Sequence, residues 1–330
     1  MKRAPLRIAI VTPARRGSLQ GNRVTALRWA RILRDLGARV TVTTEYSGQR
    51  ADLLIAMHAR RGAAAVSRFA AAHPGRPIVV ALTGTDLYRD LPRSRKAARA
   101  LEQAARIVVL QPPARDRLAP HLRAKTRVIY QSVKRTVRRK RRAARSFDVC
   151  FLGHLRAVKD PFRAALAARL LPPESRIRIV AAGRALEAGM ARRARAEERR
   201  NPRYRWLGEL SHARVLALLA RSRLLVLSSR LEGGANALSE ALAVGVPALA
   251  SDVEGSSGIL GPDYPGLFPV AHTRRLTALL SRAESDSAFY RELERRCHRL
   301  APLVAPAREL RSWKKLLAEL ERPRNRGFSQ

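Results

Sequence analysis

The second half of the chain contains one pair of basic residues and one pair of acidic residues, each pair closely spaced in the sequence. Arg156 and Lys159 lie three residues apart after an apolar run, and two cations at that spacing can neutralise the charge on a departing phosphate. Glu232 and Glu240 lie eight residues apart, separated by a Gly-Gly turn and an expected helix start. Carboxylates accept hydrogen bonds from sugar and ribose hydroxyls, and the first backbone N–H groups of a helix attract an anion. These residues predict a site for a phosphate group and sugar hydroxyls.

A loop rich in arginine and glycine follows the first apolar run of the chain. Its glycines include Gly17 and Gly21, and its arginines are Arg15, Arg16 and Arg23. Glycines let backbone N–H groups approach a diphosphate closely, and the arginines add positive potential. The loop is therefore expected to bind an anion, with a plain turn as the alternative. The spacing Gly17-x-x-x-Gly21 lacks the G-x-G-x-x-G pattern of dinucleotide-binding folds, which disfavours a nicotinamide cofactor.

Two further segments follow expected strands, where ligand sites form in α/β proteins. Thr83-Gly84-Thr85-Asp86 is expected either to receive an acceptor or to cap the next helix. His154 follows a strand in the second half, which favours a sugar or phosphate contact over a packed core histidine. No H-x-x-x-H, C-x-x-C or clustered aspartate motif occurs in the sequence, so no metal site is expected.

Short β-branched runs alternate with longer segments of helical period, which is typical of parallel sheets with crossover helices. In the first half, the expected strands are Arg7–Thr12, Arg39–Thr44, Leu53–Met57, Ile78–Leu82, Ile107–Leu110 and Arg127–Tyr130. In the second half, they are Phe147–Leu152, Ile177–Ala182, Tyr204–Leu207, Leu224–Leu227 and Ala248–Ser251. The expected helices are Arg23–Leu36, Pro161–Leu171, Ala185–Arg199, His212–Ser222, Asn236–Val244 and the tail. The fold class is therefore α/β, with two tandem doubly wound, Rossmann-like domains facing a crevice in which a ligand binds.

A chain of 330 residues exceeds one compact core, so more than one domain is expected. The expected division is a first Rossmann-like domain at residues 1–132, a basic linker at 133–146, a second Rossmann-like domain at 147–305 and a C-terminal helix at 306–330 that packs back on the first domain. Eight of the fourteen linker residues are basic and none is acidic. A solvated, extended linker is favoured over a segment that binds nucleic acid, because no aromatic residues are interleaved among the basic ones for base stacking.

The charge balance is strongly basic, with 66 Lys+Arg against 26 Asp+Glu and a formal net charge of +40. Such a balance implies an anionic partner, an anionic substrate or an arginine-rich coding bias. Cys150 and Cys297 can form one disulfide at most, which favours a reducing, cytoplasmic location. The chain has no apolar run of about 18 residues, and its first run is too short for a signal peptide, so no membrane anchor is expected.

Three features together resemble glycosyltransferases of the GT-B fold, in the group related to glycogen synthase and sucrose synthase. They are the E-x7-E arrangement of Glu232 and Glu240, the Gly-x-x-Arg-x-x-Lys segment at 153–159 and the two α/β halves. The resemblance covers nearly the whole chain. More narrowly, four segments resemble the selenosugar synthases of selenoneine biosynthesis: Arg15–Arg23, Thr83–Asp86, Gly153–Pro161 and Glu232–Asn236. Those enzymes join selenophosphate to the sugar of a UDP-sugar and form a carbon–selenium bond.

The resemblance implies roles for individual residues. The catalytic residues would be Arg156 and Lys159, which hold the donor diphosphate and stabilise departing UDP, and Glu232, which contacts the transferred sugar. Glu240 would bind the ribose of the donor. The other implied donor-binding residues are Gly17, His154, Gly183, Leu207, Gly234, Ala235, Asn236 and Ala237. The implied acceptor-binding residues are Arg15, Arg16, Asn22, Arg23, Thr85 and Asp86.

The chain departs from the usual pattern of these transferases in two places. Their Glu-Gly-Phe-Gly is here Glu232-Gly233-Gly234-Ala235, and their acidic or histidine acceptor residues are replaced by Thr83-Gly84-Thr85-Asp86. An anionic acceptor that is already nucleophilic needs cations more than a general base, which agrees with the arginine-rich loop.

The expected function is transfer of N-acetylglucosamine or glucose from a UDP-sugar to selenophosphate. No metal or other cofactor, no nucleic acid and no stable membrane anchor are expected to take part. One alternative is an ordinary hexosyltransferase whose acceptor is a lipid or glycan hydroxyl. The other is a non-catalytic protein that binds nucleic acid through its cationic surface.

Overall fold

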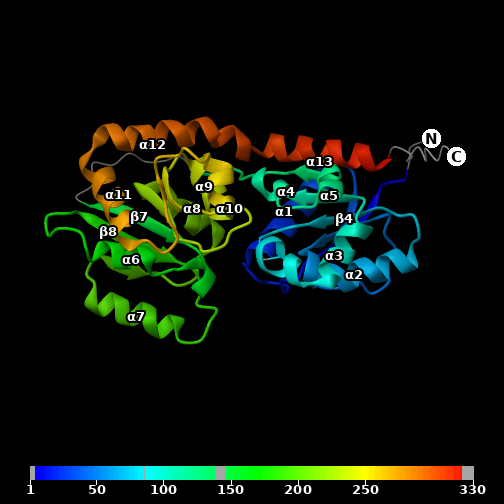
Figure 1. Ribbon diagram of the computed structural model, residues 1–330, viewed down its shortest axis with the longest axis horizontal. Helices are drawn as coiled ribbons and strands as arrows, with labels where there is room; N and C mark the ends of the chain where they lie inside the picture. The colour runs from blue at the N-terminus through cyan, green and yellow to red at the C-terminus, as the bar shows by residue number, and fades with distance from the viewer. Residues whose placement is uncertain (1–3, 85, 138–145, 322–330) are drawn as a thin grey trace. The chain divides into compact units, whose positions relative to one another are not determined.

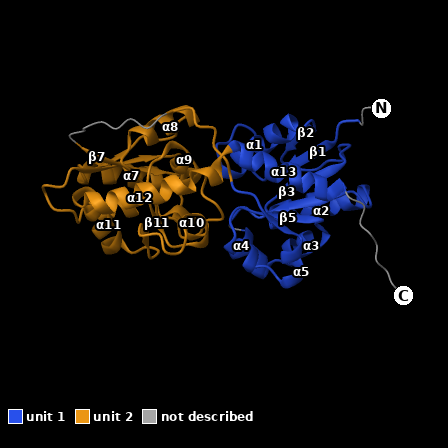
Figure 2. Ribbon diagram, turned by 90° about the horizontal axis from the view of Figure 1, so that it is seen from above, with its two compact units in different colours: residues 1–130, 306–330 blue, residues 131–305 orange. Residues whose placement is uncertain are grey.

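The computed structural model describes residues 4–84, 86–137 and 146–321, and the chain divides into two compact units. Unit 1 comprises residues 1–130 and 306–330, and unit 2 comprises residues 131–305 (Figure 2). Each unit is built on a parallel β-sheet with helices packed against it (Figure 1). The expected α/β class, with two doubly wound halves and a helical C-terminal segment, is confirmed.

The described part of unit 1 contains a six-stranded sheet in the order β2-β1-β3-β4-β5-β6. Its strands are β1 (Arg7–Val11), β2 (Arg39–Thr43), β3 (Leu53–Met57), β4 (Ile78–Ala81), β5 (Arg106–Val109) and β6 (Thr126–Val128). Its helices are α1 (Gly21–Asp35), α2 (Ala59–Ala72), α3 (Arg95–Gln103), α4 (Pro113–Asp116), α5 (Pro120–Ala124) and α13 (Pro306–Glu321). A π-helical turn, η1 (Asp86–Asp90), and a 3-10 turn, η2 (Leu91–Arg93), precede α3.

The core of unit 1 lies on both faces of this sheet, because successive side chains of a strand point in opposite directions. On one face, Leu54 of β3 packs in a cluster with Phe69 of α2. On the other face, Leu53 packs in a cluster with Trp29 of α1 and Trp313 of α13. In Figure 1, α2 and α3 lie below the strands of this unit and α13 lies above them. The continuous apolar sequence of β3 is thus that of a central parallel strand covered on both sides.

The C-terminal helix α13 is tied to α1 by aromatic and ionic contacts. The rings of Trp313 and Trp29 meet edge to face, with centroids 4.8 Å apart. The buried carboxylate of Glu309 accepts hydrogen bonds from Trp29 Nε1 at 2.8 Å and from Arg28 Nε at 3.0 Å. A buried carboxylate is stable only when it is paired and hydrogen-bonded, so these contacts hold α13 in one place on α1.

The described part of unit 2 contains a second six-stranded parallel sheet, in the order β12-β11-β10-β7-β8-β9. Its strands are β7 (Phe147–Leu152), β8 (Ile177–Ala182), β9 (Tyr204–Trp206), β10 (Leu224–Leu227), β11 (Ala248–Ser251) and β12 (Leu267–Phe268). Its α-helices are α6 (Arg163–Ala168), α7 (Met190–Arg200), α8 (His212–Arg221), α9 (Asn236–Val244), α10 (Glu254–Leu260), α11 (Thr273–Ser285) and α12 (Ser287–Leu300). Two 3-10 turns, η3 (Ala157–Lys159) and η4 (Ala301–Val304), complete the described elements.

The expected helix at Pro161–Leu171 is shortened to α6, and unit 2 differs more clearly from the sequence prediction at two other elements. The helix expected from Ala185 begins at Met190, because Ala185 forms a β-bridge with Leu155 and Gly189 adopts a left-handed φ of +75° just before the helix. The short strand β12 is not predicted by the sequence, since two residues are too few to display an alternating pattern. No helix in the described ranges is long and apolar enough to cross a membrane.

Candidate active site

The carboxyl edge of the unit 2 sheet brings together Lys159 and Glu232, which are far apart in the sequence. Lys159 Nζ forms an ion pair with Glu232 Oε2, and Ser229 Oγ donates a hydrogen bond to the same oxygen at 3.1 Å. Ser228, directly after β10, donates through its Oγ to the carbonyls of Lys159 at 3.2 Å and Asp160 at 2.9 Å. The end of β10 therefore fixes both the turn that carries Lys159 and the carboxylate that faces it.

Arg156 lies at the start of the same turn. Its carbonyl accepts a hydrogen bond from Lys159 N at 2.9 Å, which closes η3. The Arg156 side chain is half-buried, and no described residue forms an ion pair or side-chain hydrogen bond with it. The turn thus holds one cation that is paired with Glu232 and a second that has no internal acid, an arrangement suited to an anionic ligand.

The backbone of Gly255 in α10 packs closely against the backbone of Glu232. Gly255 is not among the residues predicted from the sequence. A Cβ at position 255 would lie 2.2 Å from the carbonyl oxygen of Glu232 and 2.7 Å from its Cβ. Only glycine permits this approach of the two backbones. The available sequence clue is a glycine in the first turn of an expected helix, where glycine is otherwise unfavourable.

Gly183, at the end of β8, is required by a second close approach of backbone to backbone. Its φ is +149°, and a Cβ there would lie 2.0 Å from the carbonyl oxygen of Gly153, at the end of β7. In the next residue, Arg184 N donates to His154 Nδ1 at 3.2 Å. A ring nitrogen that accepts a hydrogen bond carries no proton, so neutral His154 has its proton on Nε2. Gly183 and His154 therefore belong to one packed pair of strand ends.

The end of β9 is hydrogen-bonded to the end of β8, next to the end of β7. Trp206 Nε1 donates to the Gly183 carbonyl at 2.9 Å, Leu207 N donates to Ala181 O at 2.8 Å, and Gly183 N donates to Gly208 O at 2.7 Å. These bonds bring the sequence-predicted residues His154, Gly183 and Leu207 to a single edge of the sheet. That edge lies where ligands bind in open α/β sheets.

Helix α9 begins directly after the Gly-Gly turn and carries Glu240 on its second turn. Its N-cap residue, Ala235, supplies no side-chain hydrogen bond, and no acidic residue lies in the first turn. The first N–H groups of a helix have no partner within the helix, so the segment from Gly234 to Ala237 presents positive potential. Glu240 is 9% exposed, and its Oε1 lies 3.2 Å from Nε2 of His212.

The predicted acceptor residues belong to unit 1, where the arginine-rich loop joins β1 to α1. Arg15 and Arg16 are exposed, Asn22 is half-buried, and Gly17 adopts a left-handed φ of +79°. Arg23 is only 8% exposed, and its buried Nε has no hydrogen-bond partner in the described part of the chain. A buried guanidinium with an unsatisfied nitrogen is costly, so this position favours an anionic ligand.

Asp86, predicted from the sequence either to contact an acceptor or to cap a helix, has a structural role in the fold. No part of the residue is exposed, and its oxygens accept backbone N–H bonds from Thr83 at 3.0 Å, Gly84 at 2.8 Å and Ala59 at 3.2 Å. Ala59 is the first residue of α2, so Asp86 caps α2 rather than the helix that follows it. Thr85, the other predicted acceptor residue of this segment, lies outside the described residues.

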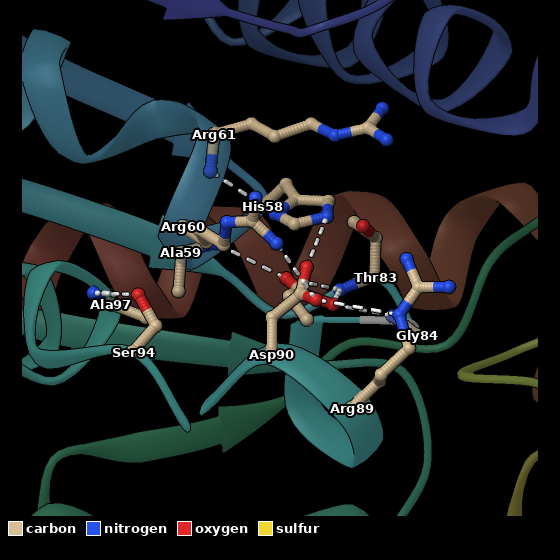
Figure 3. Close-up of polar contacts among 11 residues, drawn as sticks. His58, Ala59, Arg60, Arg61, Thr83, Gly84, Arg89, Asp90, Ser94 and Ala97 are labelled. Atoms are coloured by element: carbon tan, nitrogen blue, oxygen red, sulfur yellow. Dashed lines mark hydrogen bonds and ion pairs between the residues drawn. The ribbon is translucent and has the colours of Figure 1, made fainter. Parts of the chain in front are cut away.

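A buried histidine completes this cap (Figure 3). His58 Nδ1 accepts a hydrogen bond from Arg61 N at 3.3 Å, and its Nε2 lies 3.5 Å from Asp90 Oδ2. Arg60 and Arg89 approach the same aspartate from the surface, at 3.3 and 3.4 Å. Burial lowers the pKa of His58 below its ordinary value, although the neighbouring aspartates act in the opposite direction. The cluster therefore holds a neutral imidazole that organises the loop after β4.

The described ranges contain no group of three or more histidine, cysteine, aspartate or glutamate side chains that could hold a metal ion. Burial raises the pKa of the Cys150 thiol to about 12, so this cysteine stays protonated inside β7. Cys297 is likewise buried, within hydrogen-bond distance of Tyr264 Oη at 3.2 Å. Neither thiol is placed to act as a nucleophile.

Two six-stranded parallel sheets, each covered by helices, are the architecture of the GT-B class of proteins. The model of the family "Glycosyl transferases group 1" matches residues 133–301, just over half of the chain, and the chain belongs to that family. No protein of curated function matches the chain.

Several solved structures share the fold at low sequence identity. HepE of Anabaena, solved with UDP and glucose, superimposes with a TM-score of 0.77 and 15% identity, covering 95% of this chain and 100% of HepE. Sucrose-phosphate synthase of Thermosynechococcus elongatus gives a TM-score of 0.75 and 15% identity, covering 96% and 99% of the two chains. TarM of S. aureus gives 0.63 and 14% identity, covering 80% of this chain and 55% of TarM. These similarities confirm the GT-B fold.

Proposed function

We propose that this glycosyltransferase uses a UDP-sugar as donor and selenophosphate as acceptor, and so forms a carbon–selenium bond. The observation that carries the donor half of the proposal is the pairing of Lys159 with Glu232, a few residues before the start of α9, whose N-cap residue Ala235 makes no side-chain hydrogen bond. Those groups match a ligand that carries both a diphosphate and sugar hydroxyls. HepE, which shares the fold, was solved with UDP and with UDP-glucose.

Departure of UDP is the step that the cations assist. When the bond between the sugar C1 and the diphosphate oxygen breaks, its electron pair moves onto that oxygen, and the developing charge is stabilised by Arg156 and Lys159. Lys159 must then weaken its ion pair with Glu232 in order to contact the phosphate. Glu232, released from part of that ion pair, accepts hydrogen bonds from hydroxyls of the transferred sugar. The start of α9 adds positive potential for the diphosphate.

The acceptor half of the proposal is supported by the arginine-rich loop of unit 1 and by the sequence resemblance to selenosugar synthases. Selenophosphate is an oxyanion whose selenium is already nucleophilic, so it needs positive charge to hold it rather than a base to deprotonate it. Arg23 supplies a buried cation whose Nε has no partner among the described residues, and Arg15 and Arg16 add exposed charge. Selenium attacks C1 as UDP leaves, which gives a seleno-sugar phosphate that hydrolysis by water converts to the selenosugar and phosphate.

The test is a measurement of UDP release with UDP-N-acetylglucosamine or UDP-glucose, in the presence and absence of selenophosphate. We expect release that depends on selenophosphate and a product whose mass contains selenium bound to the sugar. Release at the same rate without selenophosphate, with only free sugar or a glycosylated hydroxyl compound as product, would overturn the acceptor assignment while leaving the donor assignment in place.

A pair of arginine substitutions on α1 tests the acceptor site directly. Arg23→Gln should raise the KM for selenophosphate about tenfold or more with the KM for the UDP-sugar unchanged, because a charge-assisted contact is lost. Arg31→Gln removes an exposed arginine from the same helix and serves as the matched control. Equal effects of the two substitutions would exclude a specific role for Arg23.

Transfer to a hydroxyl acceptor is the second candidate. It is favoured by the structures that share the fold, which include HepE in complex with UDP and glucose and the pneumococcal O-GlcNAc transferase GtfA in complex with UDP and GlcNAc. In that case a general base would be needed to accept the hydroxyl proton. UDP release that responds to an added glycan or lipid rather than to selenophosphate would establish this candidate.

A further inference from the structure

Glu240 of α9 is a largely buried carboxylate that meets a histidine from the neighbouring helix. Its side chain is 11% exposed, and its Oε1 lies 3.2 Å from Nε2 of His212, the first residue of α8. The imidazole is 58% exposed and therefore lies at the surface beside a carboxylate that is almost enclosed. Helices α8 and α9 pack together, and this contact joins the first residue of α8 to the second turn of α9.

Glu240 interacts electrostatically with one buried group that cannot orient it by charge. Cys150 of β7 is fully buried, and burial, with a further contribution from Glu240, raises its pKa to about 12. The thiol therefore remains neutral at physiological pH. Among the described residues, His212 is the ion-pair partner of Glu240. A contact on Oε1 fixes the plane of the carboxylate and with it the direction of Oε2.

We propose that His212 is a positioning residue that orients Glu240 toward the ribose hydroxyls of the nucleoside diphosphate donor. This inference rests on the proposed function, in which Glu240 binds the ribose of the UDP-sugar. A carboxylate held in advance in its binding geometry loses less conformational entropy when the ligand arrives, so the contact raises donor affinity without entering the chemical step. The role predicted for His212 is therefore in donor binding and specificity for an intact ribose.

The experiment measures the binding of UDP and of 2′,3′-dideoxy-UDP, which lacks both ribose hydroxyls, by titration calorimetry with the full chain. His212→Ala should weaken UDP binding about three- to tenfold, the range expected for one lost hydrogen bond to a charged group near the surface. The same substitution should leave the affinity for 2′,3′-dideoxy-UDP unchanged, because no hydroxyl remains for Glu240 to bind. In turnover assays the KM for the UDP-sugar should rise by the same factor, with kcat unchanged within about twofold.

Two further variants separate positioning from a general effect on folding. His212→Gln retains a side-chain N–H that can donate to Glu240 and should restore at least half of the lost affinity. His121→Ala is the matched control, since His121 forms a comparable surface pair with Glu102 at 2.8 Å in unit 1, and it should bind UDP as the wild type does. Thermal denaturation of each variant checks that the fold is retained.

The outcomes distinguish failure of this inference from failure of the proposed function. UDP binding by His212→Ala equal to that of the wild type, or an equal loss of affinity for UDP and for 2′,3′-dideoxy-UDP, would overturn the positioning role alone. A wild-type chain that binds no UDP and releases none from a UDP-sugar would refute the proposed donor, and this inference with it.

Discussion

Replacement of Gly255 by alanine tests whether the position of Glu232 controls the reaction. In the structure, a Cβ at residue 255 would lie 2.2, 2.5 and 2.7 Å from the carbonyl oxygen, carbonyl carbon and Cβ of Glu232. Non-bonded heavy atoms are comfortable at about 3.5 Å, so the two backbones must separate by about 1 Å. The atoms in the way belong mainly to backbone, which cannot rotate aside as a long side chain can. The strain is therefore expected to move the loop that carries Glu232.

Gly255→Ala is expected to change both the stability of α10 and the rate of the reaction. Within a helix, alanine is more stable than glycine by roughly 0.5–1 kcal/mol, so Gly255→Ala would stabilise α10 if no contact intervened. A shift of about 1 Å in a group that contacts the reacting substrate can cost about 100-fold in rate. We therefore expect kcat for UDP release to fall about 100-fold, while the variant remains folded with a lower urea denaturation midpoint, because overpacking costs about 1–3 kcal/mol and exceeds the gain in helix stability.

The assay is UDP release at saturating donor, with circular dichroism and urea denaturation as checks on folding. Gly62→Ala in α2 of unit 1 is the matched control, because its Cβ would meet Ala56 Cβ at 3.2 Å, a contact that a few tenths of an ångström relieves. The control should retain wild-type kcat. A folded Gly255→Ala variant with kcat within threefold of wild type would refute the reasoning, as would a Glu232→Gln variant of normal activity.

Three other substitutions test the site and the packing around it. Lys159→Ala should lower kcat about 100- to 1000-fold with the fold intact, because the cation proposed to stabilise the leaving diphosphate is lost. Lys314→Ala on the exposed face of α13 should leave the UDP-release rate unchanged. Burial lowers the pKa of His58, so the unfolded chain takes up a proton that the native chain does not, and stability should fall as the pH drops below about 6.5. Urea denaturation at pH 7.5 and 5.5 measures this loss of stability, which should be smaller in His58→Gln than in the wild type. An equal loss in the two proteins would contradict a buried neutral imidazole. Glu309→Ala should cost roughly 3 kcal/mol in the same assay, because Arg28 loses its buried counter-charge; a loss below 1 kcal/mol would show that α13 is held by its apolar contacts alone.

The parallel sheets could be predicted because their central strands are nearly all apolar. Runs such as Leu53–Met57 and Leu224–Leu227 are buried along their whole length, and such runs between helical segments have few other interpretations. Boundaries were less predictable where backbone geometry decides them. Alanine and leucine at 185 and 186 suit a helix, yet the bridge between Ala185 and Leu155 extends the chain up to the left-handed turn at Gly189.

Residues with distinctive chemistry were easier to predict than residues that act through packing. Lys159 and Glu232 were singled out by type and spacing, and the structure places them in direct contact. Gly255 and His212 were not singled out, because each matters through a neighbour on another element. The closeness of Gly255 to Glu232 and of His212 to Glu240 depends on how α8, α9 and α10 pack, which is not encoded in any local pattern.

Asp86 and Glu232 show why burial has to be known before a carboxylate at a strand end can be assigned to a ligand. Both follow strands at a carboxyl edge of a parallel sheet, where the topology alone favours a binding role for either. Asp86 is fully buried and accepts three backbone N–H bonds, so binding a ligand would require it to abandon the cap of α2. Glu232 is held by side chains, Lys159 and Ser229, which can exchange partners without unfolding a helix. The physical difference lies in what each carboxylate would have to give up, and it favours Glu232 over Asp86 for the proposed contact with the sugar.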